Sequence, residues 1–194
     1  VLNSSSQFIG LFGYSEGTRI RDVVLGSHSS TTCTKVSPGG FNNVGGIIGK
    51  CEGKDNACVI ESVVNMADIS LSEELFSNDI LVGGIAGHLC ATSYDATVKN
   101  CANYGIVDAN GRGGYLELGG IAGRCSGNSG SKAYVKNCAN YGPIIKNTED
   151  FCKVNFGGIT GNIPKQGHAV LENCLSAGSL LFGNDYSLFG TVVG

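Results

Sequence analysis

The stretch Gly119–Gly123, which reads GGIAG, decides the fold because close copies of it recur along the whole chain. The closing glycines of successive copies are separated by 36, 38, 36 and 38 residues, and a weaker last copy ends 33 residues later. These closing residues are Gly13, Gly49, Gly87, Gly123, Gly161 and Gly194. A repeat of this size indicates a chain built from one small unit that is stacked several times.

A second motif keeps step with the first. It reads VKNCANYG from Val98 and again from Val135, and the shared period makes chance repetition untenable. Shorter forms begin at Ile20, Ile60 and Leu171. Each repeat offers three short apolar stretches without a helical period, such as 118–125, 133–138 and 143–145. We therefore expect three strands per repeat.

One such repeat cannot bury its own apolar face, so the copies must stack and share a core. The sequence predicts an all-β fold: a parallel β-solenoid of about five coils with 36–38 residues each, right-handed like nearly all parallel crossover connections. We expect residues 1–194 to form a single repeat domain within a longer array or a fibre. A β-propeller has repeats of similar length, but its blades need four strands, and the chain lacks four clean strands per repeat.

Composition excludes several classes of protein. Glycine supplies 31 of 194 residues, well above the average of about 7%, yet no G-X-Y period indicates collagen. With 42% hydrophobic and 15% charged residues the chain is too apolar for disorder. A net charge of −3 without a basic run argues against nucleic acid as a partner, and no apolar stretch is long enough for a membrane span. The start at Val1, without Met or a signal-like segment, is typical of a processed or excerpted piece.

Nine cysteines favour an oxidising, extracellular compartment. Three of them share an aligned column with Val23 and Val63, so this column favours small apolar groups and predicts buried free thiols at Cys101, Cys138 and Cys174.

The remaining cysteines are candidates for disulfides. Cys51 and Cys58 flank one turn, and Cys90 and Cys125 follow equivalent glycines on neighbouring coils, whereas Cys33 and Cys152 have no assigned partner. Six cysteines allow fifteen connectivities, so the two pairings are candidates among several. Asn3 lies in the sequon Asn3-Ser4-Ser5 and is a candidate glycosylation site.

Four further columns carry polar or aromatic residues. Asparagines stack one residue before the cysteines and again two residues after them, where their amides can bond along the stack and tolerate left-handed turns. Tyr104 and Tyr141 share the next column and more often cover a corner than stack a sugar. The column after the closing glycine holds Tyr14, Lys50, His88, Arg124 and Asn162. Like charges stacked there favour a solvated face.

No pattern of residues predicts catalysis, a cofactor or a metal site. The chain contains neither C-x-x-C nor G-x-S-x-G, and its three histidines occupy non-equivalent positions. Polysaccharide cleavage needs convergent carboxylates, but the acids are scattered through loops. These acids are Asp55, Asp68, Glu73, Glu74, Asp79, Glu149 and Asp150. We therefore expect a chain that is not an enzyme.

The two motifs together resemble the GLUG-type repeats of secreted and cell-surface proteins, over most of the span from Gly10 to Gly194. The resemblance implies a β-solenoid that serves as a stalk or interaction module, without catalytic residues. Our leading hypothesis is a non-enzymatic extracellular module, either an adhesin stalk or a fibre subunit whose partners are further copies of itself or other repeats of its parent chain. Glycans or other cell-surface ligands are further candidate partners, and the alternative function is a carbohydrate-binding or polysaccharide-degrading β-helix.

Overall fold

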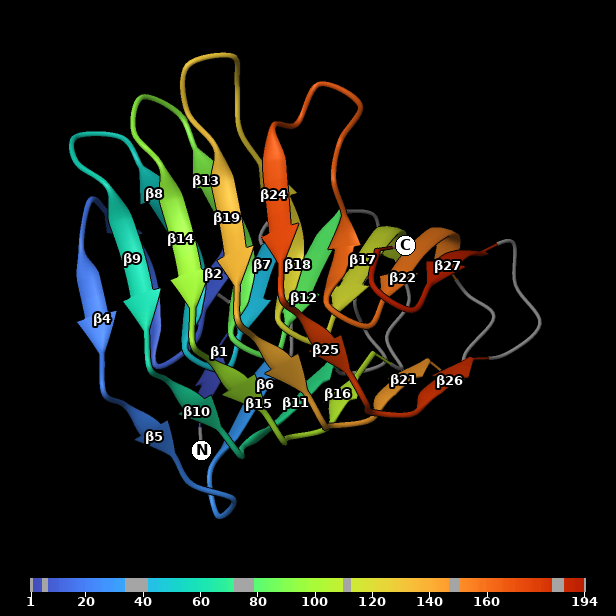
Figure 1. The fold of residues 1–194 in the computed structure, drawn as a ribbon. Helices are drawn as coiled ribbons and strands as arrows, with labels where there is room; N and C mark the ends of the chain where they lie inside the picture. Colours follow the sequence, from blue (N-terminus) through green and yellow to red (C-terminus); the bar gives the residue numbers. More distant parts are fainter. Residues whose placement is uncertain are drawn as a thin grey trace.

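The computed structural model describes residues 2–4, 7–33, 42–71, 79–109, 113–146, 151–182 and 187–193. These residues form strands and turns only, and the strands assemble into five parallel sheets that we name A to E (Figure 1). Within the described ranges no helix is long and apolar enough to cross a membrane.

The sheets contain the following strands. Sheet A contains β1 (Leu2–Ser4), β6 (Ser30–Cys33), β11 (Asp68–Leu71), β16 (Val107–Asp108), β21 (Ile144–Lys146) and β26 (Leu180–Phe182). Sheet B contains β2 (Phe8–Ile9), β7 (Asn42–Gly45), β12 (Ile80–Gly83), β17 (Gly113–Gly119), β22 (Phe151–Gly157) and β27 (Ser187–Gly190). Sheet C contains β3 (Phe12–Glu16), β8 (Ile48–Gly53), β13 (Ala86–Ala91), β18 (Ala122–Ser126) and β23 (Thr160–Asn162). Sheet D contains β4 (Arg19–Arg21), β9 (Cys58–Glu61), β14 (Ala96–Lys99), β19 (Ala133–Lys136) and β24 (Ala169–Glu172). Sheet E contains β5 (Val24–Leu25), β10 (Val64–Asn65), β15 (Ala102–Asn103), β20 (Ala139–Asn140) and β25 (Leu175–Ser176).

The chain visits sheets A, B, C, D and E in turn and then begins the next coil. Each strand therefore pairs with the strand five places earlier and the strand five places later. All of these pairings are parallel and keep equivalent repeat residues opposite one another, for example Val98 opposite both Ile60 and Val135. The predicted all-β parallel β-solenoid is confirmed.

The expectation of three strands per coil is wrong, because each coil contributes five. The apolar stretch 118–125 is not one strand: it bends at Gly120 and Ile121, so that β17 ends at Gly119 and β18 begins at Ala122. The bend needs glycine for close packing, since a Cβ atom on the equivalent Gly84 would overlap the Asn103 side chain and the Gly120 carbonyl oxygen.

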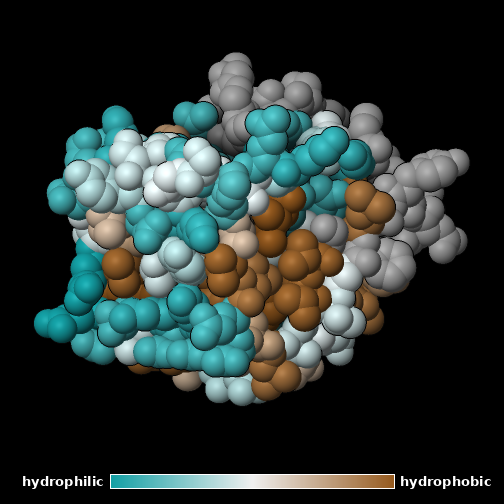
Figure 2. All heavy atoms as spheres, turned by 45° about the horizontal axis from the view of Figure 1, so that its top comes forward, coloured by the Kyte–Doolittle hydropathy of each residue, from teal (hydrophilic) through white to brown (hydrophobic). Residues whose placement is uncertain are grey.

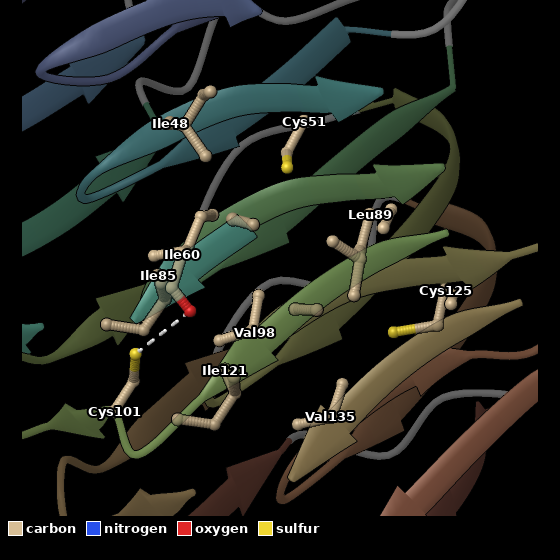
Figure 3. Close-up of a cluster of buried hydrophobic side chains, with 14 of the residues drawn as sticks. Ile48, Cys51, Ile60, Ile85, Leu89, Val98, Cys101, Ile121, Cys125 and Val135 are labelled. Carbon is tan, nitrogen blue, oxygen red and sulfur yellow. Dashed lines mark hydrogen bonds between the residues drawn. The ribbon is translucent and has the colours of Figure 1, made fainter. Parts of the chain in front are cut away.

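Two hydrophobic cores lie on either side of this bend. The first core lies between sheets C and D, where side chains from successive coils, such as Ile48, Leu89 and Val135, point into one space (Figure 3). The second core lies between sheets A and B and includes Ile69 and Val82. Every coil therefore buries side chains against its own opposite wall and against the coils above and below.

Candidate functional site: residue ladders and open ends

A buried ladder of asparagines runs along sheet E through Asn65, Asn103 and Asn140, which are all fully buried. The Asn65 Nδ2 atom donates to the Asn103 Oδ1 atom at 2.8 Å, and the Asn103 Nδ2 atom donates to the Asn140 Oδ1 atom at 2.9 Å. Each Nδ2 atom also donates to a backbone carbonyl two residues further on. The predicted stack of amides is confirmed here, and it satisfies polar groups that would be costly to bury alone.

A second, exposed ladder lies three residues earlier in each repeat. Its members have positive φ angles of 51–56° at Asp22, Ser62, Asn100, Asn137 and Asn173. The Asn137 Nδ2 atom donates to the Asn100 Oδ1 atom at 3.1 Å, and the Asn173 Nδ2 atom donates to the Asn137 Oδ1 atom at 3.3 Å. The left-handed corner is therefore confirmed at this column, where asparagine tolerates the conformation better than most residues.

The predicted cysteine column carries free thiols at Cys101, Cys138 and Cys174. Cys101 and Cys138 are buried, and Cys174 in the last coil is half-buried. The Cys101 Sγ atom lies 3.1 Å from the Lys99 carbonyl oxygen and 3.8 Å from that of Ile60 (Figure 3). The hydrogen bond to Cys101 and the burial of the thiol both raise the pKa of Cys138. Such protonated sulfurs behave as small apolar groups.

One of the two suggested disulfides forms. The buried Cys51 of β8 forms a disulfide with Cys58, the first residue of β9, and their Cα atoms are 6.0 Å apart. The bond closes the turn between these strands, as the sequence predicts, and crosses no coil boundary.

The other suggested pair, Cys90 with Cys125, does not form, and both residues are free thiols. The β13–β18 ladder places Leu89 opposite Cys125 and Cys90 opposite Ser126, so the two thiols face opposite sides of sheet C. The two cysteines follow their glycines by three and by two residues, and this one-residue difference turns a side chain to the other face of a strand. Burial raises the pKa of the inward Cys125 thiol to about 12.

Three other candidate side chains lie outside the described part of the structure: those of Cys33, Cys152 and Asn3. The backbone of Asn3 belongs to β1, where it pairs with Thr32. The glycosylation candidate and the partners of the two cysteines therefore stay predictions.

The column after the closing glycine was expected to face water, and this is wrong. The outer faces of sheets B and C meet across the Gly-Gly bend, so Arg124 is only 13% exposed and forms an ion pair with the fully buried Glu117. The Arg124 Nε atom donates to a Glu117 oxygen at 2.7 Å, and the Asn162 Nδ2 atom donates to the other oxygen at 2.7 Å. An acid across the bend thus offsets the positive charge that the column alone suggested.

The same column is paired with an acid in the first two coils. The Lys50 Nζ atom lies 2.7 Å from the Glu52 Oε2 atom, and the Tyr14 hydroxyl donates to that oxygen at 2.6 Å. Burial would raise the pKa of Glu52, but the hydrogen bonds from Lys50 and Tyr14 outweigh it and lower the pKa. Tyr14 also donates to Glu16, which Lys54 binds at 2.9 Å.

His88 is the titratable member of this column in the third coil. Its Nε2 atom lies 2.8 Å from the Ser126 Oγ atom, and burial lowers the pKa of the imidazole to about 3, with Lys50 and Arg124 acting in the same direction. The neutral His88 ring and the Ser126 hydroxyl therefore form a hydrogen bond that joins two neighbouring coils.

Tyr104 and Tyr141 stack on each other at the exposed corner beside sheet E. Their ring centroids are 4.8 Å apart and the rings are 16° from parallel. Half of Tyr104 and 43% of Tyr141 is exposed, and each ring packs one face against the other ring. This stacking across neighbouring coils fits the corner-covering role.

The acids named in the sequence that the structure describes do not converge. Asp55 is exposed in a turn, Asp68 is exposed at the start of β11 and Asp79 precedes β12, while the other four lie outside the described residues. Asp68 accepts a hydrogen bond from the Ile106 backbone nitrogen at 2.9 Å, which is a structural role. In the described ranges no group of three or more His, Cys, Asp or Glu residues is placed to hold a metal ion.

The two ends of the stack differ in character from its sides. At the first coil, Phe12, Tyr14 and Val24 are exposed, and a pocket of about 470 Å³ opens between β3 and β4. At the last coil the hydrophobic side chains of β24 to β27 gather over the end of the stack (Figure 2). The exposed ones are Leu175, Leu181, Phe182, Leu188 and Val192. The terminal strands β3, β4 and β5, and β24 and β25 at the other end, pair on one side only within the described chain.

Sequence reasoning missed the acid partners of the basic column. Glu117 lies seven residues before Arg124, on the other side of the Gly-Gly bend, and this spacing is the signal that could have paired them. Reading the bend as the interior of one strand hid it, because a straight strand would hold the two side chains far apart.

Comparisons of the chain with protein-family models, curated proteins and solved structures find no match. The class of the protein therefore follows from its own geometry, which is that of a parallel β-solenoid with five strands per coil. Its distinctive features are the side-chain ladders within the stack and, at both ends, strands with one unpaired edge and exposed hydrophobic side chains.

Proposed function

We propose that this chain is a structural and interaction module whose end coils accept further coils of the same kind, in a stalk or in a fibre. The observation that carries the proposal is the contrast between the sides and the ends. Ladders close the sides of the stack, whereas the ends combine unpaired strand edges with exposed Val24 and Leu175. Strand edges with apolar neighbours template further pairing.

The resemblance to GLUG-type repeats supports the same proposal and adds a location outside the cell or on its surface. The Cys51–Cys58 disulfide favours that location, because such bonds persist in oxidising compartments. A non-enzymatic role agrees with the internal pairing of the polar clusters, because the fully buried Glu117 is held by Arg124 and Asn162.

The test is the state of association of the purified chain at increasing concentration, followed by light scattering and electron microscopy. We expect end-to-end assemblies, and Leu175→Lys, which charges one end, should weaken them. Tyr94→Lys is the matched control, because Tyr94 is equally exposed but lies in the loop between β13 and β14. A wild-type chain that stays monomeric up to the millimolar range would overturn the proposal.

A further inference from the structure

The five sheets do not contain equal numbers of strands. Sheets A and B each have six strands in the described chain, whereas sheets C, D and E each have five. The surplus is one half-coil: β1 and β2 begin the stack in sheets A and B, and β26 and β27 end it in the same two sheets.

For two copies of residues 1–194, this surplus prevents simple head-to-tail stacking. If β1 and β2 of one copy lay on β26 and β27 of another, sheets C, D and E would each lack one strand at the junction. The gap would separate β24 from the next β4 by two strand spacings, about 10 Å, and leave the first core open. A continuous junction forms only when one of the two half-coils is removed.

The two half-coils occupy the same register and are both apolar at three positions. Leu2 and Leu180 share one column of sheet A, through Thr31, Ile69, Val107 and Ile144. In sheet B, the pair Phe8–Ile9 occupies the same columns as Leu188–Phe189, and a glycine follows in both cases. Each half-coil therefore offers apolar residues at the same backbone positions.

We propose that two copies of this chain join by strand exchange, in which β26–β27 of one copy replace β1–β2 of the next. The inference rests on the proposed self-association and names its mechanism. At the junction, β26 and β27 pair with β6 and β7 of the next copy, while β3, β4 and β5 of that copy pair with β23, β24 and β25. Strands β1 and β2 of the second copy are released, and every sheet becomes continuous.

The side chains at the two ends fit this junction. Arg21 and Glu172 are the end members of one outward column of sheet D, 67% and 53% exposed, and the junction makes them neighbours of opposite charge. Val24 and Leu175 are the end members of a column in sheet E whose inner members include Ala102 and Ala139. The junction brings these two exposed hydrophobic side chains together.

The N-terminal half-coil is the one to leave. Strand β2 has two residues, whereas β27 has four and is followed by a bridge between Thr160 and Val193. The C-terminal half-coil is therefore held by the longer ladder, and the exchange replaces a short strand with a longer one. Exchange of an equivalent element between copies is a low-cost route to association.

A cysteine cross-link tests the register of the junction. Arg21→Cys and Glu172→Cys are combined with Cys174→Val, which removes a nearby thiol and uses the residue found at Val63 in the same column. Strand exchange predicts a disulfide between copies, mapped by peptide mass analysis. Stacking without exchange places the two residues about 10 Å apart, beyond the reach of a disulfide. Arg21→Cys with Lys136→Cys is the matched control, since Lys136 lies in the same column one coil further in.

Deletion of residues 1–9 tests the release. Removing the competing half-coil should lower the concentration needed for half-maximal assembly on the order of tenfold, the factor expected when the competitor occupies its site nine-tenths of the time. Circular dichroism shows whether the shortened chain keeps its sheets. Assembly of the full chain without the cross-link would overturn strand exchange and leave the proposed function standing. A full chain that never assembles would overturn both.

Discussion

The two asparagine ladders of this solenoid use the same residue type at the same period for different purposes. Asn65, Asn103 and Asn140 are fully buried and bind one another and the backbone. Asn100 and Asn137 are exposed, share a weaker side-chain bond and occupy corners with positive φ. The buried ladder joins coils through its side chains, whereas the exposed ladder shapes the chain through its backbone. Burial, not residue type, decides what a column contributes.

The largest effect is expected when the buried ladder is cut in the middle. Asn103→Ala removes the hydrogen bonds that join the Asn103 side chain to Asn65 Nδ2, to Asn140 Oδ1 and to the Gly105 carbonyl, all within the buried ladder. We expect a loss of about 4 kcal/mol in the free energy of unfolding, measured by urea denaturation. The matched variant Asn100→Ala should lose far less. Equal losses would contradict the distinction between the ladders.

A buried column with a titratable member should make stability depend on pH. The imidazole of His88 has a pKa of about 3 in the fold and about 6.5 in the unfolded chain, so between these values the unfolded chain binds more protons. The free energy of unfolding should therefore fall as the pH drops, by about 2 kcal/mol from pH 6.5 to pH 5. His88→Gln should remove this part of the dependence, measured by denaturation across that window. His168→Gln, at an exposed loop position, is the control and should leave the slope unchanged.

The exposed ladder should respond to backbone conformation more than to side-chain chemistry. At Asn100, with φ of 54°, alanine should cost about 1 kcal/mol because a Cβ atom is strained in the left-handed region. Glycine at the same position relieves this strain and should cost at most about half as much. Thermal unfolding of the two variants gives the comparison, and a glycine variant that is less stable than the alanine variant would show that the amide ladder dominates here.

Substitution in the cysteine column should have the smallest effect on stability, because its thiols are buried but depend little on hydrogen bonds. Cys138→Val should change stability by less than about 1 kcal/mol, since valine occupies the same column at Val63. Cys138→Leu adds volume to the packed column and should cost about 2 kcal/mol. Urea denaturation under reducing conditions separates the two. A large loss for valine would mean that the hydrogen bonds from sulfur to the backbone carbonyls matter more than packing.

The sequence predicted the solenoid and its columns because both depend on periodicity. Stacking repeats places equivalent residues in register, so the buried thiols, the amide stack and the left-handed corner could be assigned from alignment alone. The Cys51–Cys58 disulfide could also be predicted from the sequence, because the two residues flank one short turn.

The path of the chain within one coil was harder to predict from the sequence. Residues 118–125 read as one apolar strand because the bend at Gly120 interrupts neither hydrophobicity nor alternation strongly. Only the close approach of Gly84 to Asn103 of the same coil reveals why glycine is needed, and this contact joins residues far apart in the repeat. Missing the bend also hid the Glu117–Arg124 pair and led to the wrong expectation of a solvated column.

The loops between sheets C and D form the upper edge of Figure 1, and their lengths differ between coils. Between sheets C and D the connection has four residues after β8 and β13 and six after β18 and β23. From sheet D to sheet A, by contrast, four successive coils keep the same spacing of eleven residues, which begins at Cys58, Ala96, Ala133 and Ala169. Insertions at the upper edge therefore leave every ladder in register. This edge is where an evolving or engineered version of the chain can display foreign peptides without rebuilding its frame.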